Sequence, residues 1–365
     1  MERDGMTFRQ YLAAIGVALF SPISRLLPRG VLRIAGFSGW LSPLAALPFL
    51  LLEVCMVKRL VTVEGETLGL GEALERRLGR GPGKAVTALL TLWIVFYGGV
   101  MLRAGGERLL STIYPSAHLG FFLPAILGLS VVFALGKLRT AGRCALVLML
   151  FFTVVLALSC AVALPSLRWD YVWPPDFSRA GDIALGALPV MDVLSPWALL
   201  SFLRGRVSRD ENCRNRAWRC MLFLAGLTVL LLLATIGDLG PALALRQQYP
   251  FFVMVKNLRL FDLLERFDAM VVGIWVITDY VLLGMLLLSS SAALQSLSGS
   301  RHRQVWVPPC AGGMLLAAFL VARNAFSFAA FSERIVPGVN LALVFVLLPV
   351  LSLIPPGKKL EKTEK

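Results

Sequence analysis

Charged residues, histidines and clustered cysteines are all scarce in this sequence. Of its 365 residues, 16% are charged and 57% are hydrophobic, whereas a soluble domain carries about 25% charged residues. This shortfall excludes an ordinary water-soluble surface. The two histidines, His118 and His302, and the six scattered cysteines have no metal-ligand or disulfide spacing. We therefore predict neither a metal site nor a disulfide framework.

Catalytic signatures are missing as well. The sequence has no nucleotide-binding glycine loop, no paired acids suited to an intramembrane protease, and no Ser/His/Asp set with a histidine inside an apolar run. We predict that the protein is not an enzyme and holds no cofactor.

The net charge of +14 does not point to nucleic acid. The basic residues form short clusters between apolar runs, as the positive-inside rule for membrane proteins produces. The predicted surroundings are therefore membrane lipid, and no nucleic-acid partner is expected.

Ten apolar runs approach the roughly 20 residues that a helix needs to cross a bilayer. They predict an all-α polytopic membrane protein with about ten transmembrane helices, built as one integral membrane domain over 1–365. Its halves cover about 8–164 and 183–355, and a tail follows at 356–365. The runs are Phe8–Pro28, Ala35–Val57, Gly83–Leu102, Leu119–Gly136, Ala145–Leu164, Ile183–Leu203, Ala217–Gly237, Ala269–Ser291, Val305–Val321 and Ile335–Ile354.

The distribution of Lys and Arg predicts the orientation. If the N-terminus is cytoplasmic, the cytoplasmic segments hold most of the basic residues. These segments include the richest loop, Arg204–Arg219, and the four lysines of the tail. We predict that both termini are cytoplasmic.

Two spans contain an apolar-Ser-Pro step slightly past their middle, Ser21-Pro22 in the first span and Ser195-Pro196 in the sixth. Ser before Pro suits a helix restart, with the hydroxyl as N-cap and proline at the first helical position. The restarted helix would present a positive dipole end to a carboxylate. The two spans run in opposite directions, so matched breaks predict a five-plus-five inverted repeat. The alternative is that each Ser-Pro step only kinks its helix.

Ionisable residues inside spans are the second signal, because they are costly in lipid and usually face a cavity. Asp192 precedes the second predicted break, and Asp279 lies near the middle of the eighth span. Each could bind an ammonium group or cation, or relay a proton. The alternatives are a local helix cap for Asp192 and a hydrogen bond to a neighbouring helix for Asp279. Glu53 and Arg103 lie near span ends, where snorkelling is expected, and Arg25 is either a gate residue or an interfacial anchor.

Two further segments carry weaker signals. Tyr97-Gly98-Gly99 in the third span is more typical of close helix packing than of a binding site. Apolar residues recur at helical spacing over Val253–Arg266. They predict a short amphipathic helix at the outer face, which serves either as a lid or partner surface or as a simple interfacial helix.

The order of several local motifs resembles one family. The most specific stretch runs from Tyr249-Pro250 through Glu265-Arg266-Phe267-Asp268 to Trp275. It is similar to the outer-loop proline, the charged entry to the eighth span and the tryptophan within that span in the spore germination permeases. Those proteins are the GerAB-like membrane B subunits of endospore germinant receptors, and they resemble the amino acid–polyamine–organocation (APC) transporter superfamily.

The resemblance implies a nutrient sensor in the inner spore membrane. Such a subunit binds a small germinant, usually an amino acid, and works with an A subunit and a lipoprotein C subunit. The superfamily implies a LeuT-like five-plus-five fold with broken helices 1 and 6, and a pocket between spans one, three, six and eight. Ligand-binding positions carried over in this way are Ser21, Pro22, Tyr97, Asp192, Ser195, Pro196, Trp197, Thr278 and Asp279.

Three functions remain open at the level of sequence, because one fold serves all of them. The first is a ligand-sensing receptor subunit. The second is an amino acid transporter coupled to protons or sodium. Such a transporter needs an ion site, which Asp279 and Thr278 could supply. The third is an ion or water conduit that opens in response to the germinant.

Overall fold

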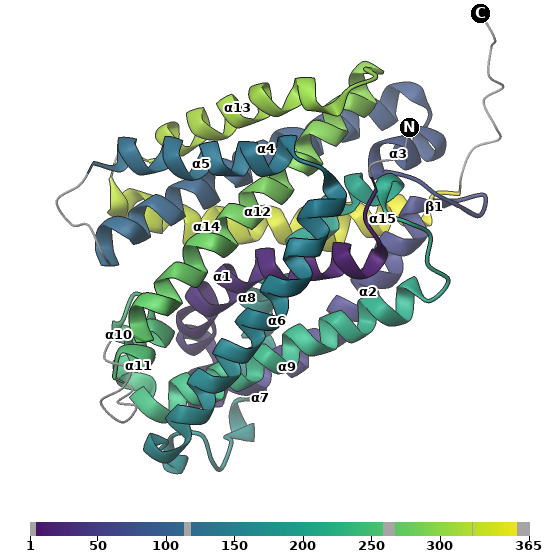
Figure 1. Ribbon diagram of the computed structural model, residues 1–365. Coiled ribbons are helices and arrows are strands. Elements are labelled where there is room, and N and C mark those ends of the chain that lie inside the picture. Colours follow the sequence, from purple (N-terminus) through teal and green to yellow (C-terminus); the bar gives the residue numbers. More distant parts are fainter. Residues whose placement is uncertain (1–4, 113–117, 258–266, 323, 356–365) are drawn as a thin grey trace, which may run out of the picture.

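The computed structural model describes residues 5–112, 118–257, 267–322 and 324–355. Within these ranges the chain is helical apart from one short β-hairpin (Figure 1). The α-helices are α1 (Phe8–Ala35), α2 (Ser42–Val61), α3 (Leu70–Leu78), α4 (Arg80–Thr112), α5 (Leu119–Leu135), α6 (Leu138–Ala163), α7 (Ala180–Leu185), α8 (Ala187–Leu194), α9 (Cys213–Leu239), α10 (Pro241–Arg246), α11 (Pro250–Asn257), α12 (Phe267–Ser298), α13 (Val307–Leu320), α14 (Ala325–Ala342) and α15 (Leu348–Leu353).

Shorter elements connect these helices. The 3₁₀ helices are η1 (Gly36–Leu41), η2 (Leu164–Ser166), η3 (Trp169–Tyr171), η4 (Phe177–Arg179), η5 (Ser195–Arg206) and η6 (Arg303–Trp306), and a π-helical turn η7 (Leu343–Leu347) joins α14 to α15. Strands β1 (Thr62–Val63) and β2 (Glu66–Thr67) form the hairpin. Its turn residues Glu64 and Gly65 both have positive φ, as a two-residue hairpin turn requires.

Seven helical stretches are long and apolar enough to cross a membrane. They are Phe8–Val61, Arg80–Ser111, Leu138–Ser166, Phe177–Arg206, Cys213–Leu239, Ala269–Ser298 and Ser327–Leu353. The first contains two of the predicted spans, because the short 3₁₀ helix η1 joins α1 directly to α2. Helix α5 is apolar but shorter. An all-helical membrane protein is therefore confirmed, whereas the number of ten spans stays a prediction.

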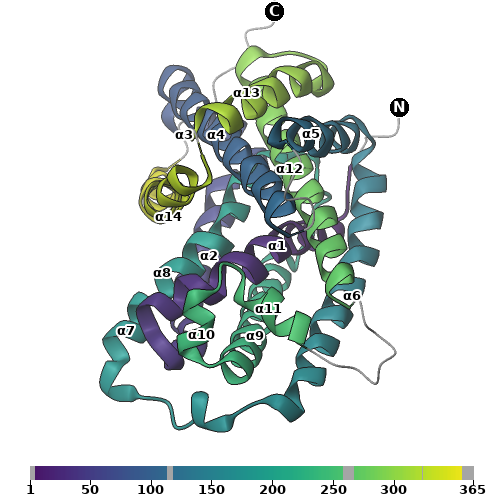
Figure 2. The same cartoon turned by 90° about the vertical axis from the view of Figure 1, so that its left-hand side faces the viewer.

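Helix α1 runs through the middle of the molecule, with α6 on one side and α14 farther out on the other (Figure 2). It packs against α6, α8, α9 and α12, and most of its side chains are buried. A capping box fixes its start. The Gln10 backbone nitrogen donates to Thr7 Oγ1, and the Thr7 backbone nitrogen donates to Gln10 Oε1. Gly36, at φ 58°, ends it.

The predicted break in the first span is wrong. Helix α1 continues through Ser21 and Pro22 without a non-helical residue. The neighbouring helices hold α1 on several sides, and the Ser24 hydroxyl donates to the carbonyls of Phe20 and Ser21. These are bonds from a serine to carbonyls in the preceding turn of its own helix. Ser21 is not an N-cap, because its hydroxyl instead accepts from Arg108.

The sixth predicted span changes helix type at its Ser-Pro step. Helix α8 ends at Leu194, and the 12-residue 3₁₀ helix η5 starts at Ser195 with Pro196 in its first turn. Both Leu194 and Ser195 keep right-handed helical torsions, and no side chain caps η5. The predicted boundary is thus present, but the unwound segment and the serine N-cap are not. A 3₁₀ run of this length is uncommon.

Close helix contacts and apolar outer faces complete the fold. A Cβ on Gly99 would lie 2.5 Å from Ala317 Cβ, so the glycine pair of the third span serves the packing of α4 against α13. Large apolar side chains are exposed on α5 and α6, including Phe121, Val132 and Val147, as lipid contact requires. Of the outer amphipathic segment, α11 is present, while residues 258–266 lie outside the described residues, as does the tail 356–365.

The chain start is attached to the end of η5. The Met6 nitrogen donates to the Arg206 carbonyl at 3.3 Å, and the Ser208 nitrogen donates to the Met6 carbonyl at 2.9 Å. These two bonds form an isolated parallel bridge between Met6 and Val207. The N-terminal end of α1 is therefore held beside the loop that follows η5.

Candidate functional site

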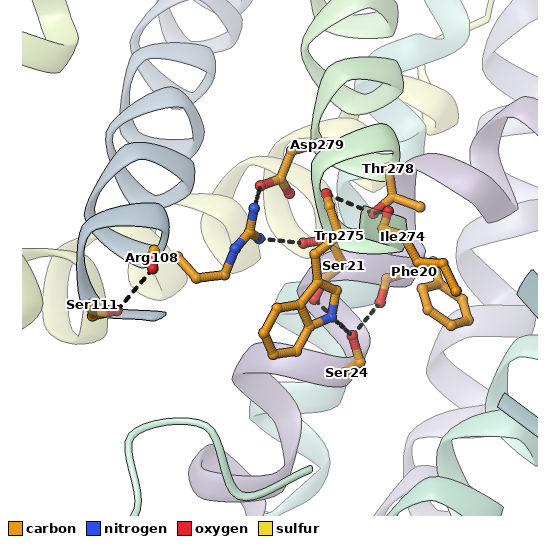
Figure 3. Close-up of polar contacts among 9 residues, drawn as sticks. All are labelled: Phe20, Ser21, Ser24, Arg108, Ser111, Ile274, Trp275, Thr278 and Asp279. Atoms are coloured by element: carbon orange, nitrogen blue, oxygen red, sulfur yellow. Dashed lines mark hydrogen bonds and ion pairs between the residues drawn. The ribbon is translucent and has the colours of Figure 1, made fainter. Parts of the chain in front are cut away.

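A buried ion pair lies between α4 and α12. Arg108 Nη2 is 2.8 Å from Asp279 Oδ2, and the two side chains are 0% and 5% exposed (Figure 3). The two helices approach closely here because Gly105 faces the carboxylate; a Cβ on that residue would lie 3.0 Å from Asp279 Oδ2. Asp279 thus has the neighbouring-helix partner that its burial in a span requires.

Two serines of α1 extend this pair into a three-helix polar network. Arg108 Nη1 donates to Ser21 Oγ at 3.3 Å, and Trp275 Nε1 of α12 donates to Ser24 Oγ at 2.7 Å (Figure 3). The Arg108 guanidinium also lies over the Trp275 ring, 5.2 Å from its centroid. Each hydroxyl therefore connects α1 to one of the two other helices.

Arg25 directly follows Ser24 on α1 and has no equivalent partner. Its side chain is only 2% exposed. None of its three guanidinium nitrogens has a hydrogen-bond partner among the described residues. The interfacial-anchor interpretation of Arg25 is therefore wrong, because an anchor must reach the membrane surface. A guanidinium stays charged in a protein, and burying it unpaired is costly.

Tyr97 of α4 is near Arg25 and an acid. The charges of Arg25 and of Asp192 on α8 both act on its hydroxyl, so the three groups are near one another. Asp192 Oδ1 accepts from Asn340 Nδ2 at 2.8 Å, and Asn340 Oδ1 accepts from Trp93 Nε1 at 3.0 Å. A chain of hydrogen bonds from α14 and α4 thus holds the Asp192 carboxylate, which does not serve as a local helix cap.

The nine residues predicted as a ligand site fall into three groups. Ser21, Pro22, Thr278 and Asp279 lie at the contact of α1 with α12, where the Thr278 hydroxyl donates to carbonyls of its own helix. Tyr97 and Asp192 share the surroundings of Arg25. Ser195, Pro196 and Trp197 lie at the start of η5. Trp197 lines a separate cavity at the other end of α1, together with Tyr11 and Arg204.

Two charged residues expected to snorkel are buried inside the protein. Glu53 is 2% exposed, and its carboxylate lies beside the Trp197 indole. Arg103 is 5% exposed, pairs with Glu107 at 2.9 Å and donates to the Ala318 and Ala322 carbonyls. Snorkelling is therefore wrong for both, because their charged ends point into protein and not toward a membrane surface.

Arg108 and Asn340 are the site residues that the sequence did not single out. The predicted third span ends at Leu102, before the charged residues, whereas α4 continues to Thr112. The available signal was Asp279 itself, since a carboxylate in a span requires a cationic or hydrogen-bonding partner. Nothing in the local sequence distinguishes Asn340 as a partner of Asp192.

The arrangement provides one cation and one anion that are not bonded to each other. Arg108 and Asp279 form a pair, whereas Arg25 on α1 and Asp192 on α8 both act electrostatically on the Tyr97 hydroxyl. A guanidinium recognises a carboxylate, and a carboxylate recognises an ammonium group.

Fold and site together define a polytopic helical membrane protein with a buried polar network between its helices. The profile of the spore germination protein family (Spore_permease) matches residues 11–326. The chain therefore belongs to the spore germination protein family, which is the family that its sequence motifs predict. No curated protein matches the chain.

The outer-loop motif behind that resemblance surrounds Trp275. Tyr249, just before α11, and Phe252 within it place their rings 5.9 Å and 5.5 Å from the indole. The loop proline starts α11. These residues therefore act together, because they hold the outer loop against the tryptophan that contacts both Arg108 and Ser24.

Proposed function

We propose that this chain is the membrane B subunit of a spore germinant receptor and that it binds a free amino acid. The observation that carries the proposal is the buried Arg25 guanidinium, which has no partner among the described residues. Its charge and that of Asp192 both act on the Tyr97 hydroxyl. A free amino acid would set its carboxylate against Arg25 and its ammonium group against Asp192. The two charged ends of the ligand would then match the two charges of the site.

The same contacts favour a sensor over a coupled transporter. Asp279 and Thr278 are the residues that could form a second, ion-coupling site. Asp279 is paired with Arg108 at 2.8 Å, and the Thr278 hydroxyl donates within its own helix. Binding of the ligand at Arg25 and Asp192 therefore requires no co-transported ion. Flux of the ligand through reconstituted vesicles is the measurement that would support the transporter instead.

The remaining parts of the proposal follow from the family. The chain works with an A subunit and a lipoprotein C subunit in the inner spore membrane, with both termini cytoplasmic and without enzymatic activity. Its fold is a five-plus-five inverted repeat of about ten spans, in which the first and sixth spans meet at the ligand. The change of helix type at Ser195 supports a specialised sixth span, whereas the continuous α1 requires that side chains, and not an open backbone, bind the ligand there.

The first experiment is a thermal-stability screen of the detergent-purified full chain against free amino acids. A ligand at about 100 times its dissociation constant stabilises a protein by about 2.7 kcal/mol. Each stabilising amino acid is then compared with its amide, which lacks the carboxylate, and with its deaminated acid, which lacks the ammonium group. We expect neither derivative to stabilise the chain.

Three variants test the residues. Arg25→Gln and Asp192→Asn should each abolish the stabilisation by the free amino acid. Arg33→Gln removes a charge from an exposed residue of the same helix, whose side chain is 53% exposed, and should leave it unchanged. A folded Arg25→Gln protein that is still stabilised by the same amino acid would refute the site.

A further inference from the structure

A cavity, here called the chamber, lies beside the start of α1, away from the family motif around Trp275. The chamber has a volume of about 40 Å³ and lies between the start of α1, the end of α2, η5 and the start of α9. About 10–15 Å³ of such volume holds one water molecule, so the chamber fits a small polyatomic group. Residues that line it include Tyr11, Lys58, Trp197, Ser201, Arg204 and Arg214.

Polar groups of the chamber wall are left without partners. Tyr11 Oη, Ser201 Oγ and Arg204 Nη1 have no hydrogen-bond partner among the described residues. Each of these side chains is more than nine-tenths buried. All three groups can donate a hydrogen bond, and buried donors without acceptors are costly. The missing component is therefore an acceptor that can serve several donors at once.

The charged residues around the chamber also favour an anionic acceptor. The chamber shares Lys58, Thr62 and Arg214 with a wider depression of about 350 Å³, which Arg59 and Arg77 also line. No acidic side chain lines either space within the described part of the chain. Glu53 lies beside Trp197 but does not line the chamber. The two spaces thus form a cationic entrance that leads to a chamber of hydrogen-bond donors.

Two acids on segments that adjoin the chamber are already paired with arginines. Asp210 contacts Arg216 at 2.7 Å, and Glu66 contacts Arg76 at 3.5 Å. The first turn of α9, which begins at Cys213 and lines the chamber, adds the positive end of a 27-residue helix. Helices α2 and α9 are long apolar helices whose ends carry these basic residues, which is where a membrane presents its lipid phosphates.

We propose that this chamber is a binding site for a phosphate group, with Arg204, Tyr11 and Ser201 as the donors and Lys58 and Arg214 at the entrance. A phosphate has several oxygens that accept charge-assisted hydrogen bonds, and a guanidinium matches their geometry. The group belongs either to an anionic phospholipid headgroup or to free phosphate. This site is separate from the proposed amino acid site and does not depend on it.

The test uses the purified full chain in detergent after delipidation. Its melting temperature is measured with inorganic phosphate, with a short-chain phosphatidylglycerol and with a short-chain phosphatidylcholine, all at matched ionic strength. We expect phosphatidylglycerol, phosphate or both to raise the melting temperature. A shift with both probes identifies a site for the phosphate group alone, and a shift with phosphatidylglycerol alone identifies a lipid site. Phosphatidylcholine should have less effect, because its choline would face the cationic entrance.

Matched variants locate the effect. Arg204→Gln should abolish the shift, and Tyr11→Phe, which removes only one hydroxyl, should weaken binding about tenfold. Lys58→Gln, at the partly exposed entrance, keeps the test valid if Arg204→Gln does not fold. Arg209→Gln removes an exposed charge from the loop between η5 and α9 and should behave as the unmodified chain. Equal shifts in Arg209→Gln, Tyr11→Phe and Lys58→Gln, or no shift with any probe, would overturn the proposal.

Discussion

The buried pair of Arg108 with Asp279 should respond unequally to loss of its two members. Both side chains are removed from solvent, at 0% and 5% exposure. Asp279→Asn leaves a guanidinium that cannot lose its proton. Arg108→Gln leaves a carboxyl group that can take up a proton and become neutral. The first variant therefore retains an unpaired buried charge at any accessible pH, whereas the second can remove it.

The magnitude follows from the burial of the pair. Breaking a buried ion pair by removing one partner costs about 3–5 kcal/mol, and we expect Asp279→Asn to lie in this range. The double variant Arg108→Gln with Asp279→Asn should lose clearly less than the sum of the two single variants. An exposed pair is the control: Arg33 contacts Glu333 at 2.7 Å, but the side chains are 53% and 40% exposed. Arg33→Gln should cost less than about 1 kcal/mol.

The assay is equilibrium unfolding in mixed micelles near neutral pH. Additive losses in the double variant, or equal losses for the two single variants, would refute an ion pair at this position.

Three further outcomes are expected. Gly99→Ala should destabilise the protein by about 1–3 kcal/mol through overpacking of α4 against α13, whereas Gly128→Ala, with no atom within 4 Å of the added Cβ, should be close to neutral in the same unfolding assay. Trp275→Phe removes the 2.7 Å bond to Ser24 and should cost about 1 kcal/mol while far-UV circular dichroism stays unchanged. Ser178→Cys in a cysteine-free background should react with an impermeant maleimide added outside intact cells, and reaction only after lysis would contradict the predicted orientation.

The class of protein and its family could be predicted from the sequence because both depend on local features. Apolar runs of bilayer length predict membrane helices wherever they occur, and the residues around Pro250 and Trp275 are close enough in the chain to be recognised together. Burial of Asp279 was also predictable, since a carboxylate in the middle of an apolar run has few other places to lie.

The features that the sequence did not predict depend on tertiary contacts. Proline is a local signal for a break, but α1 stays helical through Pro22 because several helices surround it. A hydropathy rule ended the third span before Arg103, although that residue and Arg108 find partners inside the protein. The bond of Asp192 to Asn340 joins residues 148 positions apart. No periodicity or spacing within either segment encodes such a contact.

The end-to-end length of η5 depends on its helix type. A 3₁₀ helix rises about 2.0 Å per residue and an α-helix about 1.5 Å, so the 12 residues of η5 span about 24 Å in one form and about 18 Å in the other. Conversion to α-helix would retract one end by about 6 Å. Because Met6 is bonded to Arg206 and Ser208 at that end, the retraction would pull on the start of α1. One change of helical pitch would thereby become a displacement along the axis of the helix that carries Arg25.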